Sequence, residues 1–350
     1  MSSNMDIKSY RGTYSLSYQS KDDLLRTIDR EENFFIIDKT VNSLYPEIKR
    51  NLKPERVILI DINEDSKTIS YIGPVITNLI ELGFKKNNCL IAIGGGITQD
   101  ISGYISSILY RGVEWKFVPT TLLSQGDSCI GSKTSINFNG IKNVLGTFYP
   151  PKNIYVCNDF LKTLPEDDIT SGIGEMLHYF SIFDLPLAQQ LSDNYDNLVS
   201  DRSQILSYTK KSLEYKKKLI EIDEFDKNER RVFNYGHTFG HAIETLTSHN
   251  ISHGLAVIIG MKISNHISRR SGFLSEDKKK TLDSILKNIF HIQCPVNEEN
   301  INEYMSYLLK DKKNVGSSVN CILMADDGPF MHEFKDLKVL KNYILEFCNE

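Results

Sequence analysis

The chain has 350 residues, of which 41 are basic and 45 acidic, so its formal net charge at pH 7 is 41 − 45 = −4. Hydrophobic residues make up 40% and charged residues 25%, which is typical of a globular protein and excludes a disordered, collagen-like or small disulfide-rich chain. The acidic balance argues against a general nucleic-acid binder, because affinity for phosphate backbones requires a basic excess. The length predicts about two domains.

Cysteine spacing and hydropathy predict where the protein works. The six cysteines are widely spaced and form no CxxC pair, which predicts free thiols in a reducing compartment. The polar start MSSNMDIKSY has no apolar signal core, and no apolar run is long enough to span a membrane. We therefore expect a cytoplasmic protein that binds neither membrane nor nucleic acid.

Short β-branched or aromatic runs alternate with helix-compatible stretches in the first half of the chain. The predicted strands are Phe34–Ile37, Val57–Ile60, Leu90–Ile93, Lys116–Val118 and Ile154–Val156. Predicted helices between them include Lys67–Leu82 and Gln99–Leu109. This alternation predicts an α/β nucleotide-binding domain with a parallel sheet over residues 1–160.

After about residue 160 the apolar residues recur at helical spacing. Pro165 is followed by three acidic residues, which marks a helix start. Leu206, Leu213 and Ile220 are each seven residues apart, about two helical turns. Further helical patterns cover 236–271 and 276–290. The pattern predicts a mostly α-helical domain over residues 161–350.

A run of three glycines, Gly94-Gly95-Gly96, joins a predicted strand to a helical pattern that contains Asp100. Glycine lets a backbone approach a ligand closely, and the start of a helix offers free N–H groups to a phosphate. The spacing departs from the GxGxxG dinucleotide fingerprint. Taken alone, the run fits a pyrophosphate-binding turn or simply a tight strand–helix connection.

Histidines gather between residues 237 and 253. His237 and His241 are four apart and share a helix face, and His249 and His253 follow. Imidazole is a preferred zinc ligand, and a catalytic zinc takes three protein ligands. A third ligand could be a carboxylate from elsewhere, with Glu175 one candidate among many. Surface or core histidines are the alternative, and the absence of HExxH leaves a protease unsupported.

Two basic groups could bind an anion. Arg111 lies beside a predicted strand, and Lys133, Lys142 and Asn143 lie in a Gly- and Ser-rich region predicted as loop. Such groups can clamp a phosphate, although scattered basic residues are usually solvated. The run of lysines at 216–218, followed by Arg230-Arg231, fits an exposed helix face better than an anion site.

Taken in order, these motifs carry a family resemblance. They are Gly94-Gly-Gly-Ile-Thr-Gln-Asp100, Arg111-Gly, Pro119-Thr-Thr-Leu-Leu123, Asp127-Ser-Cys-Ile-Gly-Ser-Lys133, Lys142-Asn143, Leu161-Lys-Thr-Leu-Pro165, Gly174-Glu175, Asn234-Tyr-Gly-His-Thr-Phe-Gly-His241 and His253-Gly254. Over roughly residues 60–320, the chain resembles the 3-dehydroquinate synthase family of sugar phosphate cyclases.

The resemblance implies a homodimeric lyase of the shikimate pathway of aromatic amino acid biosynthesis. It implies an α/β domain that binds NAD and a helical domain that carries a divalent metal, zinc or cobalt. The family reaction oxidises a sugar phosphate transiently with NAD, eliminates phosphate, returns the hydride and closes a carbocycle by an intramolecular aldol step. The substrate of the synthase itself is 3-deoxy-D-arabino-heptulosonate 7-phosphate.

The resemblance also implies roles for individual residues. The metal ligands would be Glu175, His237 and His253. The NAD site would contain Asp38, Glu64, Lys67, Gly95, Gly96, Asp100, Thr120, Thr121 and Thr163. The substrate would meet Asp127, Lys133, Lys142, Asn143, Lys216, Arg230, Asn234, His241 and one of Lys312 or Lys313. Arg111 would reach the substrate phosphate from a neighbouring subunit.

Three positions depart from the family pattern. His178 replaces the usual Lys of a Glu-x-x-Lys motif, Ser132 replaces a Gly, and Leu255 replaces a Glu. Imidazole is mostly neutral at pH 7 and does not replace an ammonium group faithfully. A neutral sugar phosphate, such as glucose 6-phosphate or a heptulose 7-phosphate, is therefore an alternative substrate. A metal-dependent alcohol dehydrogenase of related fold and a non-catalytic binding protein are further alternatives.

Overall fold

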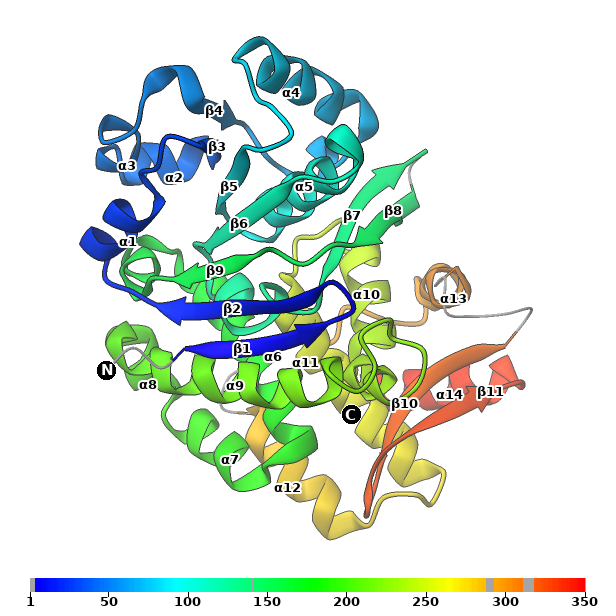
Figure 1. Ribbon diagram of the computed structural model, residues 1–350. Helices are drawn as coiled ribbons and strands as arrows, with labels where there is room; N and C mark the ends of the chain where they lie inside the picture. The colour runs from blue at the N-terminus through cyan, green and yellow to red at the C-terminus, as the bar shows by residue number, and fades with distance from the viewer. Residues whose placement is uncertain (1–3, 140, 288–292, 311–317, 350) are drawn as a thin grey trace. The chain divides into compact units, whose positions relative to one another are not determined.

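The structure is a computed structural model that describes residues 4–139, 141–287, 293–310 and 318–349 (Figure 1). The chain divides into two compact units. Unit 1 comprises Met1–Pro165 and Lys216–Phe225, and unit 2 comprises Glu166–Tyr215 and Asp226–Glu350. The boundary predicted at residues 160/161 falls within the short 3₁₀ helix η5 (Asn158–Thr163) and stays a prediction.

Unit 1 is built on a seven-stranded sheet in the order β1-β2-β9-β6-β5-β3-β4. Its strands are β1 (Met5–Ser9), β2 (Gly12–Tyr18), β3 (Asn33–Asp38), β4 (Val57–Ile60), β5 (Cys89–Gly94), β6 (Glu114–Pro119) and β9 (Asn153–Val156). All five predicted strands are present and pair in parallel. Two strands were not predicted: β2 pairs in parallel with β9, and β1 adds an antiparallel edge.

The centre of this sheet is apolar on both faces. Every residue of β5 is buried, as are the first five of β3, which is why both strands read as continuous hydrophobic runs. The helices of unit 1 are α1 (Lys21–Ile28), α2 (Lys39–Leu44), α3 (Glu47–Arg50), α4 (Ile69–Glu81) and α5 (Gly96–Ile108). Helix α5 contacts β3, β5 and β6.

The order of the strands reverses between β3 and β5. From β3 the chain moves to β4 on one side, then to β5, β6 and β9 on the other. In open α/β sheets, ligands bind outside the carboxyl ends of the strands at such a switch point. Here those ends carry Asp38 and Gly94–Gly96.

An antiparallel hairpin replaces the loop predicted around the basic residues of unit 1. Strand β7 (Lys133–Phe138) pairs with β8 (Ile141–Phe148), with a register irregularity between Ile136 and Phe138. Lys133, Lys142 and Asn143 therefore lie on strands, and the loop prediction was wrong. Apolar and polar residues alike are exposed on β8, among them Ile141 and Val144, so burial leaves no alternating pattern in its sequence.

Unit 2 is mostly helical, as predicted. Its helices are α6 (Glu166–Phe183), α7 (Leu185–Asp193), α8 (Tyr195–Ser200), α10 (His237–Leu246), α11 (His253–Arg270), α12 (Glu276–Lys287), α13 (Ile301–Leu309) and α14 (Leu337–Cys348), together with the first part of α9 (Ile205–Ile220). The hairpin β10 (Val319–Ala325) and β11 (Gly328–Phe334) was not predicted. Helix α11 is central and contacts α6, α10, α12 and α14 (Figure 1).

The helical pattern over 236–271 forms two helices, α10 and α11. The turn between them passes through Ser248 and His249, whose φ angles are 50° and 63°. The pattern over 276–290 forms α12, and its last three residues lie outside the described residues.

Two further sequence predictions concern thiols and membranes. All six cysteines are free thiols, as predicted. Within the described ranges, no helix is long and apolar enough to span a bilayer.

Candidate active site

Five side chains of unit 2 form a histidine–carboxylate cluster. It consists of Glu175 and His178 from α6, His237 and His241 from α10, and His253 from α11. His237 Nε2 lies 3.5 Å from Glu175 Oε1, and His253 Nε2 lies 3.6 Å from Glu175 Oε2. The His241 ring stacks on the His253 ring with centroids 5.6 Å apart. The sequence-predicted metal ligands Glu175, His237 and His253 are therefore neighbours.

Glycines let the three helices approach closely enough to form this cluster. A Cβ atom on Gly254 of α11 would lie 1.8 Å from the Ser171 carbonyl oxygen of α6. A Cβ atom on Gly260 would lie 1.9 Å from the carbonyl oxygen of Gly236, which precedes α10. Because neither position has room for a side chain, the glycines set the separation of the ligand-bearing backbones.

The cluster fits a divalent metal. Glu175 is 2% exposed, and its Oε2 has no hydrogen-bond partner among the described residues. Burial alone would raise the pKa of this carboxyl, but His237, with His178 and His253, outweighs burial and holds the pKa below its usual value. Two zinc ligands, each about 2.1 Å from a tetrahedral ion, lie about 3.4 Å apart. The observed separations from Glu175 agree with that spacing.

Two overlapping groups of three ligand atoms lie close enough to hold one ion. In each group, His237, His241 and His253 or Glu175, His178 and His237, the ligand atoms lie within 4.8 Å of one another. His178 and His241 thus border the predicted metal set.

Of the three residues that depart from the family pattern, His178 is the most completely buried, and it belongs to the cluster. Its side chain is fully buried, with Nδ1 3.7 Å from Glu175 Oε1. Its ring meets that of His237 edge to face at 4.8 Å and stacks on Tyr235 at 6.2 Å. An imidazole in this aromatic surrounding brings apolar surface where the family pattern has a flexible cation.

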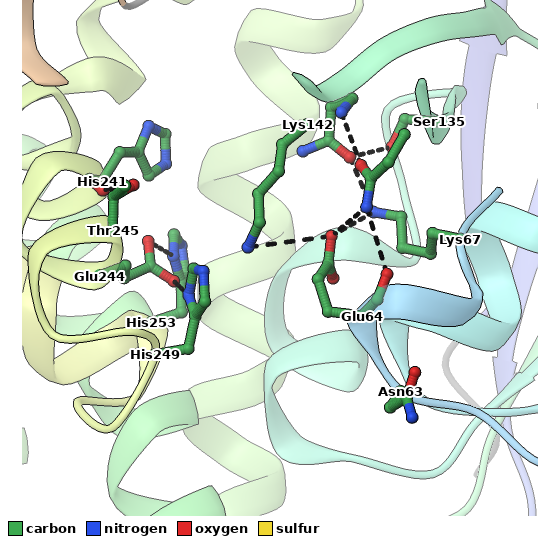
Figure 2. A network of polar contacts seen from close by, with 12 residues as sticks. Asn63, Glu64, Lys67, Ser135, Lys142, His241, Glu244, Thr245, His249 and His253 are labelled. Carbon is green, nitrogen blue, oxygen red and sulfur yellow. Dashed lines mark hydrogen bonds and ion pairs between the residues drawn. The ribbon is translucent and has the colours of Figure 1, made fainter. Parts of the chain in front are cut away.

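Sequence reasoning missed Glu244. His253 Nδ1 lies 3.0 Å from Glu244 Oε2, and His249 Nδ1 lies 4.0 Å from Glu244 Oε1 (Figure 2). A signal was available, because residues 237, 241 and 244 follow the i, i+4, i+7 spacing of one helix face.

The remaining predicted residues of unit 2 lie near the start of α10. Arg230 is 4% exposed within the 3₁₀ helix η7 (Glu229–Asn234). Asn234 ends that helix and donates from Nδ2 to the Arg231 carbonyl at 3.0 Å. Lys312 and Lys313 lie outside the described residues.

In unit 1 the glycine turn forms the start of α5. Gly95 is its N-cap, and among the described residues no side chain accepts a hydrogen bond from the first turn of the helix. A Cβ atom on Gly95 would lie 2.9 Å from Thr121 Cγ2. A helix of 13 residues with an uncapped N-terminus suits a phosphate.

Other predicted cofactor residues lie where β3 and β6 pass into the loops that follow them. Asp38 caps α2, because its Oδ1 accepts a hydrogen bond from the Thr40 backbone N–H at 2.7 Å. Burial raises the pKa of the Asp38 carboxyl. Thr120 and Thr121 follow β6 directly. These loops belong to strands adjoining β5, at the same edge of the sheet.

A buried lysine organises a second group of predicted residues. Lys67 is 4% exposed, and its Nζ lies 2.7 Å from both Asp100 Oδ2 and Asn143 Oδ1. Glu64 Oε1 lies 3.8 Å from Lys67 Nζ and 4.0 Å from Lys142 Nζ. The predicted NAD residues Glu64, Lys67 and Asp100 thus meet the predicted substrate residues Lys142 and Asn143.

Lys216 is buried, so the expectation of an exposed helix face was wrong for this lysine. Its Nζ donates to Asp127 Oδ1 at 2.7 Å and to the Asp127 carbonyl at 2.8 Å. Asp127 lies in a π-helical turn, Ser124–Ser128. These two predicted substrate residues form one pair.

The other three predicted residues of unit 1 lie on separate elements. Lys133 begins β7 with an exposed side chain. Thr163 Oγ1 lies 2.9 Å from Tyr45 Oη. Arg111 is exposed in a turn where Tyr110, Arg111 and Gly112 have φ angles of 48°, 61° and 106°. Non-glycine residues with such angles are strained, and this turn presents Arg111 to solvent.

The family is identified by comparison with known proteins. The family model of the N-terminal part of 3-dehydroquinate synthase matches residues 57–171, and that of the C-terminal part matches residues 172–314. The chain is 34% identical to the 3-dehydroquinate synthase of Clostridium tetani over 299 residues, which cover 84% of this chain and 80% of that protein.

Solved structures share the fold. The structure of 2-deoxy-scyllo-inosose synthase complexed with carbaglucose-6-phosphate, NAD+ and Co2+ has a TM-score of 0.87 at 22% identity, over 98% of this chain and 100% of that one. The 2-epi-5-epi-valiolone synthase of Streptomyces hygroscopicus, with NAD+ and Zn2+ bound, has a TM-score of 0.83 at 23% identity, over 96% and 97% of the two chains. With the two family models covering most of its length, the chain belongs to the 3-dehydroquinate synthase family.

Proposed function

We propose that this protein is a 3-dehydroquinate synthase, an NAD- and metal-dependent lyase that releases phosphate from 3-deoxy-D-arabino-heptulosonate 7-phosphate. The observation that carries the proposal is the buried carboxylate of Glu175, with the Nε2 atoms of His237 and His253 3.5 and 3.6 Å from its two oxygens. Two imidazoles and a carboxylate are a donor set of catalytic zinc sites. Membership of the family and the identity with the Clostridium tetani synthase support this substrate.

Glu175, His237 and His253 would hold the metal, and the start of α5 with Gly95 and Gly96 would receive the NAD pyrophosphate. When bound, NAD accepts and returns a hydride, and the metal acts as a Lewis acid. Asp38, Thr120, Thr121 and Thr163 would complete the NAD site with Glu64, Lys67 and Asp100. Release of phosphate then relies on positive charge supplied by the protein.

Basic side chains would supply that charge and hold the substrate. Lys133, Lys142 and Asn143 lie on one hairpin, which suits binding of a phosphate. Asn234 and His241 would contact the reacting end of the substrate. Lys216 and Arg230 are buried cations suited to an anionic substrate, and this favours a sugar acid over a neutral sugar.

We further propose that the enzyme works as a homodimer in which Arg111 binds the substrate phosphate of the neighbouring subunit. The strained, exposed turn at Arg111 supports this proposal, because strain concentrates at functional positions. Mixing an Arg111→Ala variant with a Glu175→Gln variant tests it, since hybrid dimers would regain activity that neither variant has alone. The cytoplasmic location stays a prediction.

Phosphate release in the presence of NAD and zinc or cobalt tests the proposed reaction. The substrates are 3-deoxy-D-arabino-heptulosonate 7-phosphate, glucose 6-phosphate and sedoheptulose 7-phosphate, with products identified by mass. We expect turnover of the first. Turnover of a neutral sugar phosphate alone would identify another cyclase. Net release of NADH would identify an alcohol dehydrogenase, and failure to bind metal would favour a binding protein.

A further inference from the structure

The Glu244 carboxylate lies beside His253, on the side of the ring that faces away from Glu175. The two ring nitrogens of His253 face different carboxylates: Nε2 lies 3.6 Å from Glu175 Oε2, and Nδ1 lies 3.0 Å from Glu244 Oε2. Figure 2 shows Glu244 reaching from α10 to the ring of His253 at the start of α11. One imidazole thus links the buried cluster to an acidic group that sequence reasoning did not select.

This geometry fixes the tautomer of His253. A carboxylate can only accept a hydrogen bond, so Nδ1 must carry the proton that is donated to Glu244. In the neutral ring, Nε2 then holds the lone pair and faces Glu175. Ligand histidines in metalloproteins usually donate their second N–H to a carboxylate or carbonyl, which orients the ring and raises its basicity.

The surrounding structure holds Glu244 in this position. Its side chain is 16% exposed, and its second oxygen lies 4.0 Å from His249 Nδ1. The His249 backbone N–H donates to the Glu244 carbonyl at 2.8 Å, so the turn between α10 and α11 folds back onto the last turn of α10. Leu255 stands where the family pattern has a glutamate. It is 8% exposed, and its side chain offers no hydrogen-bond acceptor.

We propose that Glu244 is the positioning residue that orients His253 as a metal ligand. This inference rests on the proposed metal site of Glu175, His237 and His253. Glu244 acts through His253 and itself contacts neither metal nor substrate. His249 is an outer neighbour whose loss leaves the hydrogen bond between Glu244 and His253 in place.

Metal affinity measured without substrate tests this role. Zn2+ binding is measured by competition with a chromophoric chelator, and Co2+ binding by its visible spectrum, for the wild type, Glu244→Ala, Glu244→Gln, the ligand variant Glu175→Ala and the control His249→Ala. For Glu244→Ala we expect zinc affinity to fall about 10- to 100-fold, with a changed cobalt spectrum, as is typical when an outer partner of a ligand is removed. Glu244→Gln retains an acceptor and should lose less, and His249→Ala should stay within about threefold of the wild type.

The outcomes separate this inference from the proposed function. Wild-type affinity in both Glu244 variants would overturn the role of Glu244 and leave the metal site standing. A loss in Glu244→Ala as large as that in Glu175→Ala would make Glu244 a direct ligand and also overturn the positioning role. Failure of the wild-type protein to bind zinc would instead refute the proposed metal site. Far-UV circular dichroism and the thermal unfolding midpoint, measured without metal, report whether each variant is folded.

Discussion

His178 stands where the family pattern has a lysine, three residues beyond Glu175 on α6. Its fully buried ring lies among Tyr235, Phe233 and His237, whereas a lysine there would bring a point charge into the cluster. If the substrate is an acid, the chain binds it without this cation. Substrate preference is therefore expected to respond to this residue.

We predict that His178→Lys raises the ratio of kcat/KM for the sugar-acid phosphate to that for glucose 6-phosphate by about tenfold or more. A hydrogen bond to a charged group contributes about 1.5–3 kcal/mol, and about 1.4 kcal/mol corresponds to a factor of ten. His249→Lys is the matched control, because its side chain is 41% exposed and lies outside the buried cluster. An unchanged ratio would remove His178 as a determinant of specificity.

Lys133 leads to a prediction about phosphate recognition. We expect Lys133→Ala to raise KM for phosphate-bearing substrates by about tenfold while leaving the dissociation constant of NAD within about twofold, since a charged hydrogen bond to phosphate contributes roughly 1.5 kcal/mol. Steady-state kinetics and NAD titration measure the two quantities. Lys85→Ala, at another exposed lysine, is the control. Equal losses for substrate and NAD would contradict the proposed role.

Single residues show how far sequence reasoning reaches. The spacing of Leu213 and Ile220 defines the buried face of α9, and Lys216 lies three residues after the first and four before the second. This i+3 and i+4 spacing places Lys216 on the buried face of the helix, whereas Lys218, two residues later, is exposed. The pairing of Lys216 with Asp127 joins residues 89 positions apart, and no local pattern encodes it.

At the scale of elements, close helix contacts hold the cluster together. Gly254 of α11 touches the backbone of α6 at Ser171, four residues before Glu175. We predict that Gly254→Ala destabilises the protein by about 1–3 kcal/mol or more through overpacking and weakens metal binding. Thermal unfolding and zinc titration measure both effects.

Gly73 supplies the control for this substitution. It lies inside α4, and a Cβ atom there meets nothing within 4 Å. Alanine favours a helix interior, but Pro74 restricts the residue before it, so Gly73→Ala should change stability by less than about 1 kcal/mol. A Gly254→Ala protein as stable as Gly73→Ala would show that α6 and α11 can separate without cost.

The elements that sequence patterns predicted are those whose burial is continuous or periodic. The runs around Ile36 and Ile91 are apolar because both faces of the sheet are covered, and this signal is local. The hairpin of β7 and β8 has mostly exposed or half-buried residues on its second strand, so its pairing leaves little trace in hydropathy. The positive φ angles at Ser248 and His249 explain why one helical pattern forms two helices.

For the whole molecule, the two proposed cofactors belong to different units. The metal cluster lies in unit 2 and the glycine turn in unit 1. We predict that zinc slows amide hydrogen exchange mainly in α6, α10 and α11, and that NAD slows it mainly after β3 and β5. At a concentration 100 times its dissociation constant, a ligand raises the free energy of unfolding by about 2.7 kcal/mol. Amide exchange therefore slows by up to about 100-fold wherever the opening that permits exchange also releases the ligand. Zinc protection confined to unit 1 would contradict the metal assignment.

The two units are not continuous in sequence. Lys216–Phe225 belongs to unit 1 although it follows 50 residues of unit 2, Glu166–Tyr215. Within unit 1, Glu224 accepts hydrogen bonds from Ser9 Oγ at 2.7 Å and from the Tyr10 backbone at 2.8 Å, and Phe225 packs on Tyr10 and Phe148. A gene fusion with a single crossover near Pro165 would therefore pair the first half of one homologue with a foreign 216–225 segment. Functional chimeras of this family member should require the returning segment to be exchanged together with the first 165 residues.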